Sequence, residues 1–576
     1  MRLDVWPTQA QFRPNSPVGL VVRIGDGEPE RRYPLAVRVS RLGDIVGAAE
    51  HSATTDAEGR ARATLELSLA AIGEDHGCAT GLAVEAAVEV SDAVRATTAL
   101  DIAAHWSAAP RYGFFADFAP DEPAAESERR ADAMLQLHLN VVQFYDWMAS
   151  HHTFFASDEE FVDPLGRRLS HAVVRRKVAL AHERGMAALA YGALYGAEPD
   201  FSDAHPDWLL YDGARQPLHL LDLFYLQDVG EGLAWRAWII DQYEQAVDRL
   251  RFDGIHIDQY GFPKRALSRA GGGWREIDVA ATFVSFVEEA ASRVRARRRD
   301  GGSIFNCVNA WPLDALARAS ADAATYIEVW EPHTTYRDLY ELVGRARALR
   351  PDKQVILAAY LRPFHPELAR TPEALNAYRL ATAAIHASGG FHLVAGEGGA
   401  LLAEAYYPHY GRLSPDEFAV VRRYADFTVR CTQLLHGPRG SDIAWTHVGP
   451  TNDAIVLRHP DLATYGAGAR PNTLWVIGHE VGETTSLQIV NLRGLPHTDW
   501  NAEQPAPAAL ADLEVRVRIS ASISGVWWDT PDDDVGVARS LPFEMVEDGS
   551  GRFLVFRVPV VAFWSSVWWR RAEADR

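Results

Sequence analysis

The spacing of apolar runs changes twice along the chain. In residues 1–108 the runs are short, are separated by turns with Gly, Asp or Pro, and include "VGLVVRIG", "YPLAVRVSRL", "RARATLELS" and "LAVEAAVEVSD". Such spacing predicts an immunoglobulin-like β-sandwich. Residues 438–576 return to this pattern, with "DIAWTHVG", "AIVLRH", "TLWVIGHE" and "TTSLQIVNL" as strand candidates. We expect a second, antiparallel β-sandwich there.

The middle of the chain, residues 109–437, has a different pattern. Apolar strand candidates alternate with amphipathic segments such as residues 232–250 and 277–299, which is typical of βα units around a parallel sheet. Eight strands are predicted, at residues 111–118, 140–147, 187–194, 254–259, 303–309, 324–330, 354–361 and 391–398. The expected fold class is therefore a (β/α)8 TIM barrel flanked by two β-sandwiches, with domains 1–108, 109–437 and 438–576.

Charge and cysteine content narrow the classes of function. The net charge of −20 and the pI near 5.5 argue against nucleic acid or an anionic membrane as a partner. Three cysteines without CxxC spacing predict neither a disulfide framework nor a thiolate metal site. Adjacent His151 and His152 lack the spacing of a helical zinc motif, and the glycines of residues 388–399 do not form GxGxxG. We expect no metal and no cofactor.

The start of the chain and its aromatic content add two expectations. The stretch "MRLDVWPTQAQFRPNSP" lacks a basic segment followed by a continuous apolar one, and no apolar run of about 18 residues occurs elsewhere. We expect a cytoplasmic protein, or a secreted one if the native chain begins earlier. The chain holds 17 Trp, 19 Tyr and 23 Phe, and flat aromatic faces suit sugars. The oligomeric state stays open.

Polar residues gather where the predicted barrel strands end. Strands two, four, five, six and eight end in "QFYDW", "IDQ", "CVN", "IEVW" and "GEG", and barrels carry their functional groups at these ends. Because residues two apart share a face of a strand, Ile255 and Ile257 should face the helices, while His256 and Asp258 face the interior. The same alternation turns Glu328 inward. Two carboxylates at the same end of the barrel are the smallest set of catalytic groups that cleavage of a glycosidic bond requires.

Other interpretations of these residues remain open at this point. A buried carboxylate can simply bond a neighbouring backbone group or an arginine, and Glu331 is a second candidate for the acid. Asp253 precedes the fourth strand and fits turn chemistry. His256 fits a buried, hydrogen-bonded core histidine, which could position Asp258, better than it fits a proton shuttle.

Five longer stretches occur in one order along the chain: "NVVQFYDWMASHHTF", "GIHIDQYG", "YIEVWEP", "GEGGALLAEAYYPHYGRLSPDE" and "NLRGLPHTDWNAEQPAP". Together they resemble glycoside hydrolase family 66, the dextranases and cycloisomaltooligosaccharide glucanotransferases. The likeness runs from about residue 111 to about residue 506, and the N-terminal sandwich matches the family's layout. The resemblance implies a retaining mechanism on α-1,6-linked glucan, with Asp258 as nucleophile and Glu328, rather than Glu331, as acid/base.

Further residues near the predicted strand ends are candidates for substrate binding. Aromatic side chains there could stack on sugar rings and polar ones could bind hydroxyls, although Asp146 and Glu397 could equally be structural braces. The candidates are Tyr145, Asp146, Trp147, His152, Tyr191, Gln259, Asn309, Trp330, Tyr360 and Glu397.

The choice between hydrolysis and transfer depends on an inserted domain. The resemblance implies that the glucanotransferases carry a carbohydrate-binding module within the barrel, and no barrel connection here is long enough for a further domain. We therefore expect a retaining glycoside hydrolase that cleaves α-1,6-glucosidic linkages of dextran or isomalto-oligosaccharides through a glycosyl-enzyme intermediate. Without a secretion signal, imported isomalto-oligosaccharides are the better-fitting substrate. The alternatives are a cycloisomaltooligosaccharide glucanotransferase-type transglycosylase and a non-catalytic glucan-binding barrel.

Overall fold

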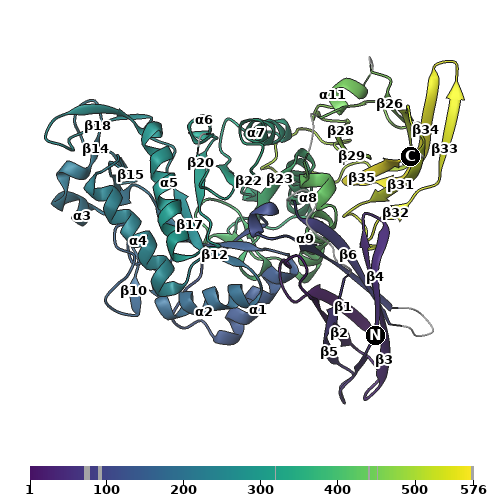
Figure 1. Cartoon of the computed structure of the whole chain (residues 1–576), viewed down its shortest axis with the longest axis horizontal. Helices are drawn as coiled ribbons and strands as arrows, with labels where there is room; N and C mark the ends of the chain where they lie inside the picture. The colour runs from purple at the N-terminus through teal and green to yellow at the C-terminus, as the bar shows by residue number, and fades with distance from the viewer. Residues whose placement is uncertain (70–77, 89–93, 318, 439–441, 450–451, 573–576) are drawn as a thin grey trace.

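The computed structural model describes the whole chain except residues 70–77, 89–93, 318, 439–441, 450–451 and 573–576. A barrel occupies the middle of the chain, and the sheets near the two chain ends lie together on one side of it (Figure 1). The predicted fold class, a (β/α)8 barrel with β-sheets before and after it, is confirmed. In the described part of the chain, every helix is too short or too polar to span a membrane.

Eight parallel strands make the barrel, and each lies within or overlaps a predicted strand. Their order in the sheet follows the chain, and the last strand lies beside the first, so the sheet nearly closes on itself. The predicted strands run longer because the polar residues at the mouth leave the sheet and enter loops. The strands are β8 (Tyr112–Phe115), β9 (Val141–Phe144), β12 (Ala187–Ala193), β17 (Gly254–Asp258), β20 (Ile304–Val308), β21 (Thr325–Glu328), β22 (Val355–Ala358) and β23 (Gly390–Leu393).

Helices alternate with these strands and cover the barrel (Figure 1). The two helical segments predicted from amphipathic patterns are present as α4 and α5. Two helices begin with a capping box, Thr335 with Asp338 and Ser414 with Glu417, which satisfies free N–H groups of the first turn. The helices are α1 (Ala124–Gln136), α2 (His171–Glu183), α4 (Ala234–Leu250), α5 (Val279–Arg297), α6 (Leu313–Leu316), α7 (Tyr336–Leu349), α8 (Pro372–Ser388) and α9 (Pro415–Arg430).

Strand β17 shows the predicted alternation of faces. Ile255 and Ile257 are fully buried in the layer of side chains between the strands and the helices. The ring of His256 instead contacts the rings of Tyr112 and Tyr326, which belong to the barrel interior. The strand therefore directs its polar side chains inward.

Side chains at the amino-terminal end of the barrel strands make structural contacts. The carboxylate of Asp253 accepts hydrogen bonds from the Ala188 N–H at 2.8 Å and faces Nε2 of His182 at 2.7 Å, and it also pairs with Arg298. These contacts fit the structural role predicted for Asp253. A hollow of about 890 Å³ lies here between the barrel and the first sheets, and Asp253 and His182 are part of its wall. It lies at the opposite end of the strands from the predicted chemistry.

Two antiparallel sheets precede the barrel and pack on a shared core. Val5 and Leu20 of one sheet are buried against Leu35 and Leu82 of the other. The predicted strands are present, although residues 89–92 of "LAVEAAVEVSD" lie outside the described residues. The sheets have the orders β1 (Arg2–Pro7), β2 (Val18–Gly25), β5 (Ala61–Leu67) and β4 (Asp44–Thr54), β3 (Arg32–Arg41), β6 (Thr80–Val88), β7 (Val94–Ile102).

Two further sheets follow the barrel. The strand predicted for "DIAWTHVG" is wrong, because α11 (Ala444–His447) is a helical turn there. Asp442 Oδ1 accepts hydrogen bonds from the N–H of Ala444 and of Gly478, which caps this turn. The sheets have the orders β26 (Ile455–Arg458), β30 (Leu510–Arg518), β34 (Gly551–Val561), β33 (Phe543–Asp548) and β27 (Tyr465–Gly466), β28 (Leu474–Val481), β29 (Thr484–Asn491), β35 (Trp564–Arg571), β31 (Ile523–Asp529), β32 (Arg539–Ser540).

Helix α9 joins the barrel to both flanking regions. Asp426 accepts hydrogen bonds from the Thr98 hydroxyl and the Ala99 N–H of β7 at 3.0 Å each. Arg430 forms a buried, two-pronged ion pair with Asp529 of β31, with both distances 2.8 Å. Buried charges of this kind are tolerated only when they are well hydrogen-bonded, so they fix the docking geometry. The predicted domain boundaries stay predictions.

The connection between β12 and β17 builds a wall beside the barrel mouth. It contains α3 (Pro199–Ala204) and a hairpin of β15 (His219–Leu220) with β16 (Phe224–Leu226). The hairpin turn places Leu221 and Asp222 at φ values of 52° and 55°. Leu221 is also 78% exposed. A leucine is strained at positive φ, so this turn is held by its surroundings.

Candidate active site

A cleft of about 770 Å³ opens at the carboxyl ends of the barrel strands. Asp258, the last residue of β17, and Glu328, the last residue of β21, both line it. Only β20 separates these two strands in the sheet. The structure thus brings together the two carboxylates that alternation directs inward.

One asparagine links the two carboxylates. The Asn306 side-chain nitrogen donates to Asp258 Oδ1 at 2.7 Å and to Glu328 Oε2 at 2.9 Å. These two oxygens cannot lie farther apart than the sum of the two distances. That limit is close to the spacing of about 5–5.5 Å in retaining glycosidases and below the roughly 6.5–9.5 Å of inverting ones. Hydroxyls of Tyr191 and Tyr360 complete the set, donating to Asp258 Oδ2 at 2.8 Å and to Glu328 Oε1 at 2.9 Å.

Burial and mutual repulsion keep a proton on this pair. Burial, followed by the charge of Glu328, raises the pKa of Asp258 to about 7, although hydrogen bonds from Asn306 and Tyr191 oppose the shift. Burial also raises the pKa of Glu328. Two carboxylates this close ionise together only at high cost, so the pair retains one proton at mildly acidic pH. The site therefore offers one acid and one base.

Aromatic rings surround the carboxylates. The ring of Tyr145 stacks on that of Tyr407 with centroids 4.4 Å apart, and the Tyr407 hydroxyl lies 3.4 Å from that of Tyr360. Trp330 is 41% exposed and meets Tyr360 edge-on. Six predicted substrate-binding residues line the cleft, namely Tyr145, Asp146, Tyr191, Gln259, Trp330 and Tyr360. Their contact with substrate stays a prediction.

Charged side chains form one side of the cleft. Asp146 Oδ1 lies 3.6 Å from Nε2 of His151, and Asp146 Oδ2 lies 3.9 Å from the Arg167 guanidinium. Burial acts to lower the pKa of His151, but the interaction with Asp146 outweighs it and the pKa is raised. Among the described residues, Asp146 Oδ1 has no hydrogen-bond partner. A buried acceptor of this kind can receive a sugar hydroxyl, so Asp146 stays a candidate.

His256 lies below the carboxylates as a core residue. It is 2% exposed, and its Nδ1 is 2.8 Å from the Tyr112 hydroxyl. Burial lowers the pKa of His256 to about 3, so the ring is neutral at ordinary pH. This is the hydrogen-bonded core histidine that the sequence favours over a proton shuttle.

Comparison with known proteins decides the family. Glycosyl hydrolase family 66 matches residues 8–568, which is nearly the whole chain. The chain belongs to this family. Two cycloisomaltooligosaccharide glucanotransferases of Niallia circulans are similar in sequence: one is 24% identical over 628 positions (83% of this chain, 63% of the relative), and the other is 22% identical over 624 positions (82% and 62%). The family 66 chain thus spans less than two thirds of these relatives.

Solved structures share the fold of this family 66 chain. A cycloisomaltooligosaccharide glucanotransferase from Paenibacillus sp., complexed with cycloisomaltoheptaose, matches with a TM-score of 0.87 and 20% identity, over 98% of this chain and 99% of that one. An α-amylase from Geobacillus thermoleovorans, complexed with acarbose, matches with a TM-score of 0.51 and 10% identity, over 82% and 100% of the two chains. At these identities the likeness concerns the fold alone.

Four predicted substrate-binding residues lie outside the family 66 cleft, and Trp147 and His152 are two of them. Trp147 is fully buried, and its indole N–H donates to the Tyr191 carbonyl at 3.1 Å. Asp146 has φ of 44°, which turns the chain so that the next side chain enters the core. Nδ1 of His152 bonds Glu198 at 2.5 Å, and the ring does not line the cleft. Substrate contact is therefore a wrong prediction for the fully buried Trp147, whereas for His152 it stays a prediction.

Two amides predicted to bind sugar hold the backbone instead. Asn309 donates to the Glu331 carbonyl and accepts from the Trp330 N–H, at 2.7 Å each, and it lies outside the cleft. Gln259 borders the cleft floor but is only 1% exposed, and its amide donates to the Asn306 carbonyl at 3.0 Å. Both side chains brace the strand ends that carry the carboxylates.

Glu397 is a buried brace as well. Its carboxylate accepts hydrogen bonds from the N–H of Ala116 and Asp117 at 2.9 Å, and it pairs with Arg130 at 3.0 Å and with Lys177. It is 1% exposed and does not line the cleft. Of the two interpretations open for Glu397, the structural one holds.

The prediction missed many of the residues that line the cleft. Asn306 occupies an inward position of β20, opposite Tyr326 in the register, so alternation along "SIFNCVN" could have found it. Other missed residues come from loops, where no periodicity marks which side chains turn inward, and Phe224 comes from β16, which is only three residues long. The missed residues include Asn306, His151, Phe224, Tyr406 and Tyr407.

Proposed function

We propose that this family 66 chain cleaves α-1,6-linked glucans with retention at the anomeric carbon and passes the glycosyl unit to a sugar hydroxyl. The observation that carries this proposal is the Asn306 bridge, because it holds Asp258 and Glu328 at the spacing of a retaining pair. The substrate class is supported by the family and by the names of the relatives, one of which was solved with cycloisomaltoheptaose.

The reaction proceeds in two displacements. In the first, ionised Asp258 attacks C1 of a glucosyl unit while Glu328 donates its proton to the departing O6; the C1–O6 bond breaks and an ester to Asp258 forms. In the second, Glu328 takes the proton of an acceptor hydroxyl, whose oxygen attacks C1 and releases Asp258. Two inversions restore the starting configuration, and Glu328 regains its proton.

The rim of the cleft favours a sugar over water as acceptor. Leu165, Leu221, Phe224 and Trp330 line this rim. Leu165 and Leu221 are 40% and 78% exposed, so both present apolar surface at the opening of the cleft. Apolar side chains there offer a surface for the C–H face of an acceptor ring and keep water from the glycosyl-enzyme.

Hydrolysis is the second candidate, and one observation favours it. The stretch aligned with the first relative, 628 positions, exceeds the 576 residues of this chain, so the relative carries segments that this chain lacks. Extra glucan contacts would keep the cleaved chain near the intermediate and raise the effective concentration of sugar hydroxyls. With fewer glucan contacts, water attacks a larger share of the glycosyl-enzyme intermediates.

Product analysis on three substrates tests the proposal. The chain is incubated with isomaltotetraose, dextran and maltotetraose, and products are followed by mass spectrometry and proton NMR. Transfer gives products longer than isomaltotetraose or rings that lack one water, whereas hydrolysis gives shorter products only. The first-formed reducing ends should be α. Cleavage confined to maltotetraose, β products, or no product at all would each contradict the proposal, the last pointing to a glucan-binding barrel.

Two variants test the roles of the carboxylates. Asp258→Ala should lose turnover, and added azide should give a β-glycosyl azide, because azide occupies the face that the nucleophile leaves. Glu328→Gln should lose activity on isomaltotetraose but keep it on α-glucosyl fluoride, whose leaving group needs no proton. Glu331→Gln is the matched control and should stay active. Full activity of Glu328→Gln on isomaltotetraose would remove it as the acid.

A further inference from the structure

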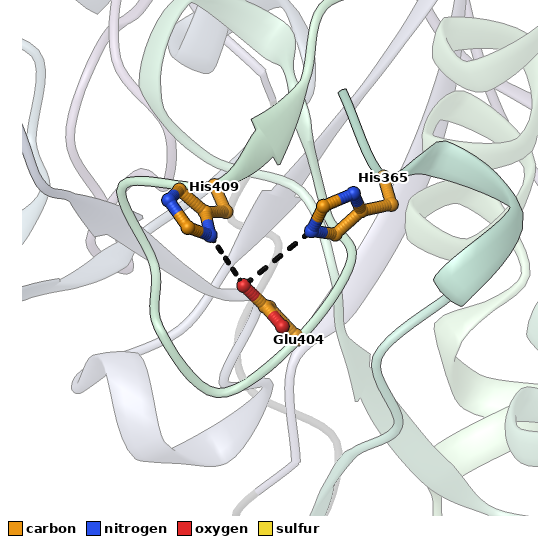
Figure 2. Close-up of side chains that lie close together, drawn as sticks. All are labelled: His365, Glu404 and His409. Carbon is orange, nitrogen blue, oxygen red and sulfur yellow. Dashed lines mark hydrogen bonds and ion pairs between the residues drawn. The ribbon is translucent and has the colours of Figure 1, made fainter. Parts of the chain in front are cut away.

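Two histidines and one glutamate converge beside the cleft (Figure 2). Glu404 Oε1 is 2.5 Å from Nδ1 of His409 and 3.6 Å from Nε2 of His365. The three atoms all lie within 4.8 Å of one another. His365 follows the short helix η3 (Arg362–Phe364), whereas Glu404 and His409 belong to the loop between β24 (Leu401–Leu402) and β25 (Tyr410–Gly411). Two separate segments thus direct three possible ligand atoms at one spot.

We propose that His365, Glu404 and His409 bind a Zn²⁺ ion. Two imidazoles and one carboxylate are a ligand set of zinc sites that keep a fourth position open. Ca²⁺ and Mg²⁺ fit poorly, because both prefer a shell of about six or more oxygen ligands. Among the residues that the structure describes, no other group of histidine, cysteine and acidic side chains offers three such atoms together. The sequence does not predict this site, because no motif spacing links His365 to Glu404 and His409.

Small side-chain movements complete the geometry. Bonds of about 2.0–2.2 Å to an ion place tetrahedral ligand atoms roughly 3.3–3.5 Å apart, so the contact of His409 with Glu404 must lengthen slightly. The side chains of His409 and Glu404 are 48% and 40% exposed and can rotate. Nδ1 of His365 accepts a long hydrogen bond, 3.3 Å, from the Glu367 N–H. Binding at Nε2 moves the proton to Nδ1 and gives up this weak bond.

The ion would fasten a loop that carries two tyrosines of the cleft. Tyr406 and Tyr407 lie between Glu404 and His409 in the chain, and both line the cleft. The Tyr406 ring also contacts the His409 ring edge-on, with centroids 4.8 Å apart. A bond from each end of this segment to one ion, and from the ion to His365, would tie the tyrosine pair to the barrel. Metal binding should therefore stabilise this wall of the cleft.

The fourth ligand can come from solvent. His365 and Glu404 line a groove of about 670 Å³ that shares Trp330 and Tyr360 with the cleft. Water in this groove reaches the three side chains without crossing the protein core. The site is thus open on one side, as the proposed coordination needs.

Zinc titration of the whole 576-residue chain tests the site. The protein is first treated with a chelator and then titrated with Zn²⁺ in competition with a coloured zinc indicator, and its melting temperature is measured in parallel. The parent should bind one equivalent and melt at a higher temperature with Zn²⁺. His365→Ala, Glu404→Gln and His409→Ala should each weaken binding by more than about 10-fold, the loss expected even for an outer partner of a zinc ligand.

His459→Ala is the matched control. The side chain of His459 is 16% exposed, close to the 18% of His365, but it faces a single carboxylate, Asp461, at 4.0 Å. This variant should bind Zn²⁺ like the parent. Binding that survives all three ligand substitutions, or no binding by the parent beyond that of the triple variant, would overturn the proposal. Displacement of Zn²⁺ by equimolar Ca²⁺ would overturn the choice of metal.

Discussion

Asp258→Asn should stabilise the folded protein more at pH 8 than at pH 5, while it abolishes turnover. Burial and the charge of Glu328 raise the pKa of Asp258 to about 7 in the folded state, against about 3.9 for an unfolded aspartate. Below both values the group is protonated in both states and contributes nothing. Between them the unfolded aspartate is ionised while the folded carboxylate pair still keeps one proton, so the parent's stability falls as pH rises. Asparagine removes this loss.

The size of the effect follows from the two pKa values. The full interval between the two pKa values corresponds to a loss of about 4 kcal/mol in the free energy of unfolding. The part of the interval above pH 5 corresponds to about 2.7 kcal/mol. Asp258 is partly exposed to the cleft, so water reduces this, and about 1–2.5 kcal/mol is expected. If all 576 residues unfold together, an unfolding entropy of about 2.1 cal/mol/K per residue sums to about 1.2 kcal/mol/K, so a change of about 1.2 kcal/mol in stability shifts the melting temperature by one degree. The variant's melting temperature relative to the parent should rise by about 1–2 °C from pH 5 to pH 8.

Differential scanning calorimetry of parent and variant at both pH values measures this difference. Comparing each variant with the parent at one pH cancels the titrating groups that do not interact with the substituted residue. Asp548→Asn is the control, because hydrogen bonds from Ser550 lower the pKa of Asp548 to about 2 and the group is charged at both pH values. A relative melting temperature of Asp258→Asn that is unchanged or lower at pH 8 would refute a retained proton on the carboxylate pair.

Two further predictions concern the cleft. Asn306→Ala removes hydrogen bonds that lower the pKa of both Asp258 and Glu328. The pH profile of kcat/KM should therefore move to higher pH. A profile that only falls in height would contradict a role of Asn306 in setting the pKa of the two carboxylates. Leu221→Gly relieves a positive φ and should leave stability unchanged or raise it by up to about 1 kcal/mol, while the ratio of transfer to hydrolysis falls. The control is Leu368→Ala, at an exposed leucine outside the cleft, which should leave the ratio of transfer to hydrolysis unchanged. If the two variants have equal ratios, the apolar rim does not determine the ratio.

The barrel was predictable because its signals repeat. A barrel strand such as β17 has one face toward the helices and one toward the interior, so alternation alone identifies its inward residues. A long helix such as α4 is identified by its amphipathic pattern. The failure at residues 444–447 has the opposite cause. A single helical turn is too short to show a helical period, and its cap depends on an aspartate that also bonds Gly478 of a distant strand.

Within the site, the limit of prediction lies in the partners of each acidic group. Glu328 and Glu397 are the same residue type and both lie at the carboxyl end of a barrel strand, Glu328 as the last residue of β21 and Glu397 shortly after β23, so a strand pattern gives little reason to separate them. Their donors separate them: Glu397 pairs with Lys177 and Arg130 from two helices, whereas Glu328 receives only neutral donors, among them Asn306. A buried carboxylate that pairs with two cations serves to hold helices and strands together, while one held by neutral donors in a cleft is available to exchange a proton with a substrate. The chemistry of a strand-end carboxylate is therefore decided by the helices around it, which a strand pattern does not reveal.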